Sequence, residues 1–247
     1  MKLTNRNNYP DALYQAVKND SYDKGECDFS VTELLKPSRQ WALQKIHQDE
    51  LIEDIEDRLW SLYGQIAHLI LERANKRDFA EERLFVEVDG SVISGQIDTL
   101  SLDDGTLSDW KFTTSYSFIK GKPAKEEWTW QLNMQRYLLW FNGYKDVESL
   151  KIVGLLRDWQ KSKAKLDSSY PQNPIAYHDI KVLGLDYVEK YIIHRKDSHL
   201  RALKELPKCT AKETWNGRRC ADYCSVAHKF CDQYNKALKT GVLNEVY

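Results

Sequence analysis

The sequence lacks any long hydrophobic run, and this absence narrows the class of protein. No apolar stretch approaches the roughly 20 residues that a membrane-spanning helix needs. The N-terminus lacks the apolar segment of a signal peptide, so we expect a cytoplasmic protein. A glycine-rich phosphate loop is also missing, which argues against a doubly wound nucleotide-binding fold. No internal repeat is present.

Excess charge of one sign is missing as well. The 247 residues carry a formal net charge of −1, unlike a protein that coats DNA non-specifically. Hydrophobic residues make up 42% and charged residues 30%, which supports a sizeable core and disfavours disorder. Residues 48–57 are acidic, whereas residues 120–126, 161–165 and 216–220 are locally basic. Such runs are usually solvated surface, but basic loops around an acidic metal centre also suit a nuclease.

The order of predicted elements favours an α/β fold with a mixed central sheet. After a first helix broken at Pro37, a long helix is predicted over residues 49–75. Its expected core stripe has helical spacing: Leu51, Ile52, Ile55, Leu59, Leu62, Ile66, Leu69 and Ile70. Later elements follow from apolar pattern and turn residues: three β segments at 83–88, 92–101 and 106–113, a helix ending at Gly143, a strand near 149–156, a polar loop from 161, an amphipathic helix from 185 and a Cys-rich tail.

Two aspartates and a lysine have spacing that suggests a metal-dependent hydrolase. Asp98 and Asp109 are placed near the ends of consecutive strands, so a hairpin would bring them within about 5 Å of each other. Two carboxylates that close repel unless a divalent cation lies between them. Lys111 leaves its strand on the same face as Asp109 and could stabilise charge on phosphate oxygens. The carbonyl of Trp110 is a plausible further oxygen ligand for Mg²⁺.

Two helical residues extend this constellation. His68 lies four residues from both Gly64 and Glu72 and falls outside the expected apolar arc, so it is a candidate metal ligand beside a glycine that permits close approach. Gln131, on the later helix, could hydrogen-bond both a water and a phosphate oxygen. Each residue alone has an ordinary structural reading, because a D-x-K pair, a lone histidine and a half-buried glutamine are common.

Taken in order, these motifs resemble the RecB-type branch of the PD-(D/E)XK nuclease superfamily, over roughly residues 28–234. The matching residues are Gly64, His68 and Glu72, then Gly95 and Asp98, then Asp109 and Lys111, then Gln131. The family often has a tyrosine four residues after the glutamine, where this chain has Gln135, and Tyr137 is a possible substitute. The stretch from residue 155 to 175 is similar to bacteriophage-encoded members.

The resemblance implies a restriction-endonuclease-like core with a mixed sheet, in a single nuclease domain over residues 1–247. Its parts would be a helical N-terminal segment (1–48), a catalytic core (49–160) and a Cys-rich helical C-terminal cap (161–247). The histidine and both acids would bind Mg²⁺ or Mn²⁺, with the lysine assisting hydrolysis of DNA. The expected activity is that of a deoxyribonuclease, an exonuclease of phage DNA recombination or processing, acting in the host cytoplasm with recombination or replication proteins. A non-cleaving DNA-binding or assembly subunit and a structure- or site-specific endonuclease are the alternatives.

Four of the five cysteines are clustered: Cys209, Cys220, Cys224 and Cys231. Four thiolates could hold zinc or a [4Fe–4S] cluster, and free buried cysteines are the simpler alternative. Some relatives, including AddB and CRISPR-associated nucleases, bind an iron–sulfur cluster with one N-terminal and three C-terminal cysteines. Here Lys36 occupies the place of the N-terminal ligand, and Cys27 lies nearby. We expect Cys209 as the fourth ligand, Trp215 as a cover, and [4Fe–4S] in preference to zinc.

Overall fold

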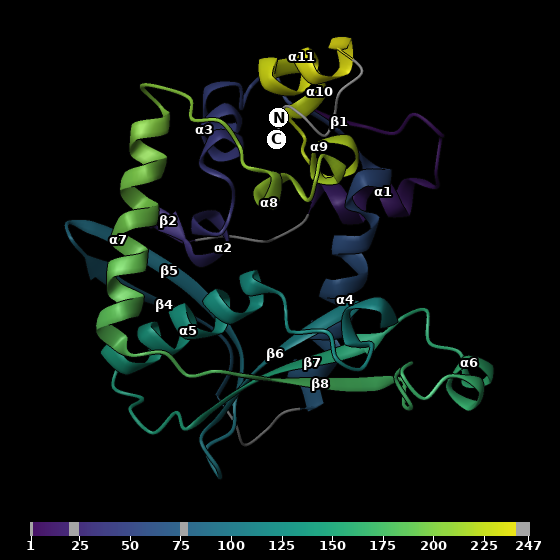
Figure 1. Cartoon of the computed structure of the whole chain (residues 1–247), viewed down its shortest axis with the longest axis vertical. Helices are drawn as coiled ribbons and strands as arrows, with labels where there is room; N and C mark the ends of the chain where they lie inside the picture. The colour runs from purple at the N-terminus through teal and green to yellow at the C-terminus, as the bar shows by residue number, and fades with distance from the viewer. Residues whose placement is uncertain (1, 20–24, 75–78, 241–247) are drawn as a thin grey trace. The chain divides into compact units, whose positions relative to one another are not determined.

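The computed structural model describes residues 2–19, 25–74 and 79–240 (Figure 1). The chain forms two compact units. The helical unit comprises Met1–Tyr22, Lys36–Leu59 and Ile193–Tyr247, and the sheet unit comprises Asp23–Leu35 and Trp60–Ile192. The predicted α/β class with a mixed central sheet is confirmed.

The sheet unit is built on six strands: β2 (Phe29–Ser30), β4 (Phe79–Val88), β5 (Ser91–Leu100), β6 (Thr106–Thr113), β7 (Ser149–Leu156) and β8 (Ile175–Ile180). Strands β4, β5 and β6 form the predicted antiparallel meander, while β6 pairs with β7 in parallel. Strand β8 is an antiparallel neighbour of β7, and β2 pairs in parallel with β5. The sheet is mixed because α5 (Glu126–Phe141) provides the crossover from β6 to β7.

One edge of β5 is divided between two partners. Its first edge pairs with β4 at every residue of β5 except Asp98. Its second edge pairs with β2 at Ile93 and Ser94 and with β6 at Thr99 and Leu100. Among the described residues, no ladder pair joins residues 95–98 to a strand on this second edge. Strands β5 and β6 therefore separate just where the predicted acids lie.

Helix α5 packs against this sheet through buried apolar side chains: Leu132, Met134, Leu138 and Leu139. A Cβ added at Gly95 would lie 2.5 Å from Cδ1 of Leu138. Gly95 therefore allows the close approach of α5 to β5. The helix ends at Phe141, and Gly143 has a φ of 96°, as expected for a glycine just beyond a helix C-terminus.

Two predicted elements differ in kind from the structure. The long helix begins only at α4 (Leu59–Ala74), because β3 (Ile52–Asp54) and the 3₁₀ helix η1 (Ile55–Arg58) precede it and Asp54 caps η1. Its expected core stripe is wrong in part, since Ile66, Leu69 and Ile70 are 46%, 46% and 60% exposed. The predicted polar loop from residue 161 contains helix α6 (Lys161–Leu166) and strand β8.

The remaining elements of the sheet unit are α2 (Val31–Leu34), the 3₁₀ helix η2 (Ser115–Phe118) and the first eight residues of α7 (Leu185–Ala202). Ser30 forms a reciprocal capping box with Glu33 at the start of α2, a favourable arrangement for a helix N-terminus.

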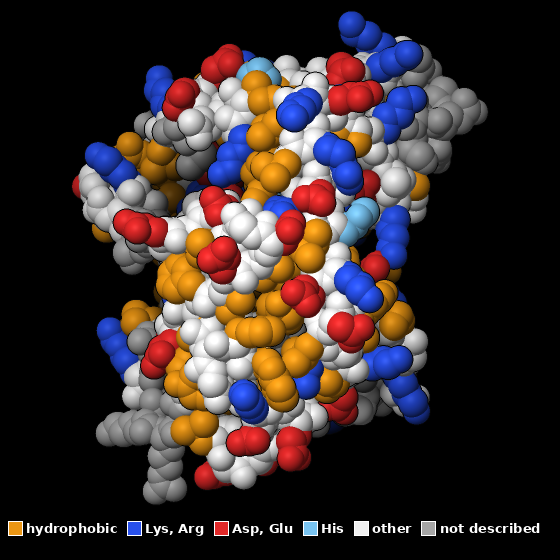
Figure 2. All heavy atoms as spheres, turned by 90° about the vertical axis from the view of Figure 1, so that its left-hand side faces the viewer, with side chains coloured by type: hydrophobic (Ala, Val, Ile, Leu, Met, Phe, Trp, Pro, Cys, Tyr) orange, Lys and Arg blue, Asp and Glu red, His pale blue; other side chains and the backbone are white. Residues whose placement is uncertain are grey.

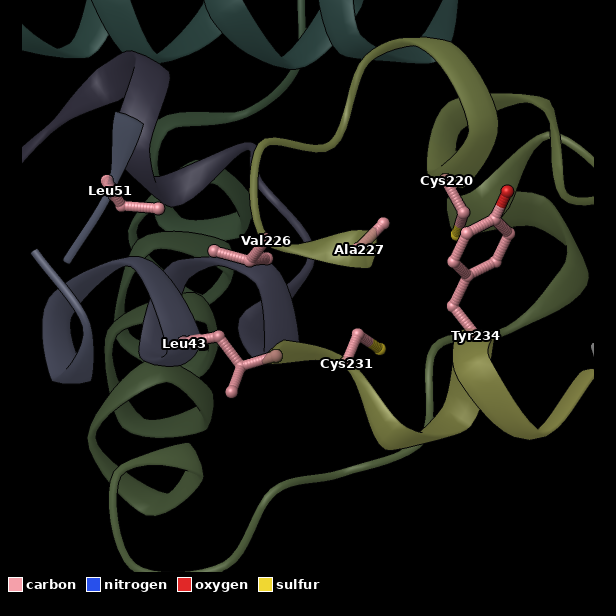
Figure 3. Close-up of a cluster of buried hydrophobic side chains, with 7 residues drawn as sticks. All are labelled: Leu43, Leu51, Cys220, Val226, Ala227, Cys231 and Tyr234. Carbon is pink, nitrogen blue, oxygen red and sulfur yellow. The ribbon is translucent and has the colours of Figure 1, made fainter. Parts of the chain in front are cut away.

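The helical unit contains the parallel pair of β1 (Lys2–Thr4) with β3 and the remainder of α7. Its other helices are α1 (Asp11–Lys18), α3 (Ser38–Ile46), α8 (Ala211–Thr214), α9 (Arg218–Asp222), α10 (Ala227–Phe230) and α11 (Asp232–Thr240). One hydrophobic cluster of this unit combines α3 with the Cys-rich segment through the side chains in Figure 3: Leu43, Leu51, Cys220, Val226, Ala227, Cys231 and Tyr234.

The surface carries charges of both signs, as the formal net charge of −1 indicates. On the face shown in Figure 2, Lys and Arg side chains are interspersed with Asp and Glu. Within the described residues, no helix is both long and apolar enough to cross a membrane.

Candidate active site

Three carboxylates form a row across three neighbouring strands. The register of β5 and β6 ends at the pair Thr99 and Ser108, so the next step places Asp98 opposite Asp109. In the same way, the register of β4 and β5 places Glu81 opposite Asp98. Like charges directly opposite each other destabilise a sheet. The row is therefore a costly arrangement for a protein without a bound cation.

His68 of α4 lies beside this row. Its Nδ1 is 3.0 Å from Oε1 of Glu81 and 3.7 Å from Oδ2 of Asp98. Ligand atoms of His68, Glu81 and Asp98 all lie within 4.8 Å of one another. Glu81 also accepts a hydrogen bond of 2.6 Å from Nε2 of Gln96. One imidazole and two carboxylates are acceptable ligands for Mg²⁺ or Mn²⁺.

Asp109, Lys111 and Gln131 form a connected group on the α5 side of β6. Asp109 is 1% exposed, and its Oδ1 accepts a hydrogen bond of 2.7 Å from Nε2 of Gln131. Lys111 Nζ donates to Oε1 of Gln131 at 3.1 Å and lies 2.6 Å from Oδ2 of Asp109. That short ion pair lacks hydrogen-bond geometry, so the buried Oδ2 accepts no hydrogen bond. The charge of the Lys111 ammonium is therefore the contact of Oδ2, and a bound cation would compete with Lys111 for this atom.

Burial and charge repulsion perturb the ionisation of this site. Burial, followed by the negative charge of Asp109, raises the pKa of Asp98 to about 7. The hydrogen bond to Glu81 raises the pKa of His68, and the charge of Asp98 adds to this effect. Asp98 also accepts a hydrogen bond of 2.8 Å from the backbone N–H of Trp110. A cation would relieve the cost of ionising Asp98 at neutral pH.

The two residues considered at the family's tyrosine position have other contacts. Gln135 is buried and donates through Nε2 to the backbone oxygen of Gln96 at 2.7 Å. It therefore satisfies a carbonyl on the divided edge of β5. Tyr137 is 2% exposed, and burial together with a hydrogen bond to Glu189 raises its pKa to about 12. The Tyr137 hydroxyl is engaged with α7 rather than with the carboxylate row.

Two further residues of the helix motif are less informative. Gly64 was expected to let another element approach α4 closely. That expectation is wrong, because a Cβ added at Gly64 would meet nothing within 4 Å. Glu72 belongs to α4, but its side chain lies outside the described residues.

A second candidate site lies in the helical unit, where Cys209, Cys220, Cys224 and Cys231 line one small cavity. Figure 3 shows the sulfur atoms of Cys220 and Cys231 directed toward the same region. Burial raises the pKa of Cys209 to about 12 and that of Cys224 to about 11. Both thiols are therefore protonated at neutral pH, and a metal would have to displace their protons.

Polar side chains fix the positions of two of these cysteines. Gln233 accepts a hydrogen bond of 2.9 Å from the backbone N–H of Cys209 and donates one of 3.0 Å to its oxygen. Arg39, only 5% exposed, donates from Nε to Sγ of Cys231 at 3.3 Å and from Nη1 to the backbone oxygen of Pro207 at 3.0 Å.

The other residues expected near this centre are placed differently. Cys27 belongs to the sheet unit, where its sulfur accepts a hydrogen bond of 3.1 Å from Oγ of Ser94. Trp215 is 41% exposed and contacts Arg219 and Tyr223 rather than lining the cysteine cavity. A covering role for Trp215 stays a prediction.

Comparison with known proteins supports the fold alone. No family model and no curated protein matches the chain. Among solved structures, the chain resembles the crystal structure of SSO0001, with a TM-score of 0.56 and 19% sequence identity. The match covers 89% of this chain and 93% of that chain. At this identity the likeness shows a shared fold over nearly the whole chain.

Glu81 is the site residue that the sequence analysis missed. The predicted strand began at residue 83, whereas β4 begins at Phe79. Extending the hairpin register by two residues would have placed Glu81 opposite Asp98. Glu81 also has a φ of 53°, in the left-handed region that non-glycine residues rarely adopt. Such strain often accompanies a functional position.

Proposed function

We propose that this protein is a metal-dependent deoxyribonuclease with a PD-(D/E)XK core of the RecB type. The observation that carries the proposal is the row of Glu81, Asp98 and Asp109, flanked by His68 on one side and Lys111 on the other. A purely structural role would not favour three acids side by side in a largely buried place. Metal-assisted hydrolysis of a phosphodiester needs this combination of acids and a cation.

The residues present fit a divalent cation. Oδ2 of Asp109 is buried with the Lys111 ammonium beside it, and burial together with the charge of Asp109 raises the pKa of Asp98, so a cation would lower the cost of ionising this carboxyl. Asp98, Asp109 and His68 would hold Mg²⁺ or Mn²⁺, with Glu81 and the carbonyl of Trp110 as additional oxygen ligands. The ion would activate a water nucleophile and stabilise negative charge on the phosphate.

The side chains around the acids have separate tasks in this proposal. The ammonium group of Lys111 would donate a hydrogen bond to a phosphate oxygen. Its positive charge would stabilise the negative charge that builds up on that oxygen during attack by water. Gln131 would hold Lys111 and Asp109 in their relative positions through its two hydrogen bonds. The attacking water gives up a proton to solvent as its oxygen forms a bond to phosphorus. The bond from phosphorus to the leaving oxygen breaks, and a solvent proton reaches the leaving oxygen.

Removal of the Lys111 amine is the direct test. Lys111→Ala should lower DNA cleavage in Mg²⁺ or Mn²⁺ by at least about 100-fold, which is the usual effect of losing one charge-stabilising donor. Lys151→Ala, on the neighbouring strand β7, is the matched control and should retain activity. Circular dichroism would check that both variants fold. Near wild-type turnover by Lys111→Ala would exclude the role assigned to that lysine.

The alternatives differ in what the wild-type protein does to DNA. An exonuclease of phage recombination or processing should degrade open linear DNA and spare end-blocked DNA. An endonuclease should cut both, whereas a non-cleaving DNA-binding or assembly subunit should cut neither, with or without Mg²⁺.

We further propose that the four clustered cysteines bind a [4Fe–4S] cluster as part of a C-terminal cap. Tetrahedral zinc, with bonds of about 2.3 Å to sulfur, would need sulfur atoms about 3.8 Å apart. Among the described residues, no three of the cysteine sulfurs lie within 4.8 Å of one another. A cluster whose four irons each take one cysteine is compatible with this spacing. Anaerobically purified protein should be brown and contain about four irons per chain, whereas one zinc per chain would refute the cluster.

A further inference from the structure

Exposed aromatic side chains gather beside the candidate active site. Trp60 and Tyr63 of α4 have ring centroids 5.8 Å apart, and Tyr63 is 6.3 Å from the ring of Phe112 on β6. These rings are 57%, 42% and 39% exposed. The guanidinium of Arg157 lies 3.6 Å from the centroid of the Trp60 ring. We call these four residues the aromatic platform.

The platform shares helix α4 and strand β6 with the residues proposed for catalysis. The side chain of Phe112 leaves β6 on the face opposite that of Lys111, where it contacts Tyr63 of α4. His68 of the same helix reaches Glu81 and Asp98. The backbone N–H of Arg157 donates to the oxygen of Thr113 at 3.0 Å, which fixes Arg157 beside the end of the same strand. A nucleic acid whose phosphate reached an ion held by His68 and Asp98 would therefore carry its neighbouring nucleotides toward the α4 side of the sheet, where the platform lies.

The chemistry of the platform fits nucleobases. Bases of a single strand stack on aromatic rings and on arginine guanidinium groups, whatever their sequence. Lysines that could contact the strand's backbone lie close by in the chain, because Lys161, Lys163 and Lys165 of α6 follow Arg157 and are exposed. In Figure 1, α6 lies beside the ends of β7 and β8 at the right of the view.

We propose that the aromatic platform is a subsite that stacks unpaired bases next to the scissile phosphate. The proposal rests on the proposed nuclease function and adds residues that position the substrate. A duplex would offer stacked, paired bases whose faces are not accessible to these rings, so the platform favours an unpaired end.

The alternative occupant of this face is a second copy of the chain. Helix α4 also exposes the aliphatic side chains of Ile66, Leu69 and Ile70, which a partner helix could cover. The stacked guanidinium and nearby lysines favour a polyanion at the platform instead. Cleavage kinetics and the oligomeric state together distinguish the two occupants.

The test compares Trp60→Ala with wild type on two substrates. One is a 5′-fluorescein-labelled oligonucleotide of about twelve thymidines, and the other is the same length with abasic sites next to the cleaved position. In Mn²⁺, Trp60→Ala should raise KM for the thymidine substrate about tenfold with kcat little changed, because one lost stacking contact typically has this effect. Trp60→Phe should largely restore KM, and the abasic substrate should show no difference between the variants.

Tyr177→Ala is the matched control, since Tyr177 is 61% exposed on β8 of the same sheet and lies outside the platform. It should leave KM unchanged. Equal losses on both substrates, an unchanged KM in Trp60→Ala and Tyr63→Ala, or an equal effect of Tyr177→Ala would each overturn the proposal. The proposal would also be overturned if the wild-type protein were a dimer and Trp60→Ala converted it to a monomer without changing KM.

Failure of the proposed nuclease function would give a different experimental result from failure of the platform proposal. Wild-type protein that cleaves neither substrate in Mg²⁺ or Mn²⁺ would refute the catalytic proposal. Fluorescence anisotropy with the same oligonucleotides would then still report on the platform. Preference for the thymidine strand that disappears in Trp60→Ala supports the platform, and absence of such a preference overturns it.

Discussion

Replacing Asp98 by asparagine should stabilise the metal-free protein at alkaline pH. Asp98 lies between Glu81 and Asp109, and its pKa is raised from 3.8 to about 7. A difference of this size corresponds to at most about 4 kcal/mol of unfavourable free energy once the carboxyl is ionised in the folded state. The substituted amide would carry no charge, yet its oxygen could still accept the hydrogen bond from the backbone N–H of Trp110.

The sign of the pH dependence follows from proton binding. Between about pH 4 and 7 the folded protein keeps a proton on Asp98 that the unfolded chain has lost, so stability decreases as pH rises through this window. His68 contributes stability at lower pH that is lost as pH rises through its own raised pKa, and part of that gain depends on Asp98. The net advantage of Asp98→Asn at pH 8 should therefore be about 2–4 kcal/mol, and it should shrink toward zero near pH 4.

Urea denaturation in EDTA at pH 4 and pH 8 measures this effect. Asp103→Asn, which changes an exposed acid beyond the end of β5, is the matched control and should have little influence. Adding Mn²⁺ at 100 times its Kd should stabilise wild type by about 2.7 kcal/mol and the Asp98→Asn variant by less. An Asp98→Asn variant that is less stable than wild type at pH 8 in EDTA would refute the electrostatic reasoning.

Three further predictions use single substitutions. Gly64→Ala should raise the free energy of unfolding by about 0.5–1 kcal/mol, because α4 has room for a methyl group there. Gly95→Ala should lower it by about 1–3 kcal/mol, because the added methyl group would clash with α5. Urea denaturation that ranks the two variants in the reverse order would contradict the packing described for these glycines. His68→Ala should lose nuclease activity most at limiting metal, with partial rescue at high Mn²⁺; a purely structural histidine would lower Tm without changing the metal dependence. Cys224→Ser should lose its metal and melt earlier, while Cys27→Ser should keep the metal by elemental analysis; metal loss in Cys27→Ser would place an N-terminal ligand at the centre.

The hairpin that contains the two aspartates could be predicted because its information is local. Alternation of side chains marks β5 and β6, and Gly90 and Gly105 adopt positive φ angles at the turns. The register then fixes which residues of the strands are neighbours. For this reason Asp98 and Asp109 could be paired, and Lys111 assigned to the face of Asp109, from the sequence alone.

Other features depend on tertiary contacts that the local pattern does not contain. The apolar positions of α4 indicate an amphipathic helix but not what covers its apolar face, and Ile70 is 60% exposed. Glu81 was missed because β4 begins with Phe79, Ala80 and two glutamates, which do not alternate like a half-buried strand. Strand β8 is an edge strand with exposed residues, and the sequence leading into it reads as a polar loop with two prolines.

The interruption in the pairing of β5 connects the fold with the site. A buried backbone group without a partner costs about 1–3 kcal/mol, so the gap at residues 95–98 needs polar side chains to fill it. Gln135 does this for the oxygen of Gln96, and the carboxylate of Asp98 does it for the N–H of Trp110. The same opening that lets Asp98 reach the backbone of β6 also brings its carboxylate beside His68 and Asp109. A continuous ladder would give a more regular sheet, but the N–H of Trp110 would then bond to a backbone oxygen of β5 and would no longer hold the Asp98 carboxylate in place.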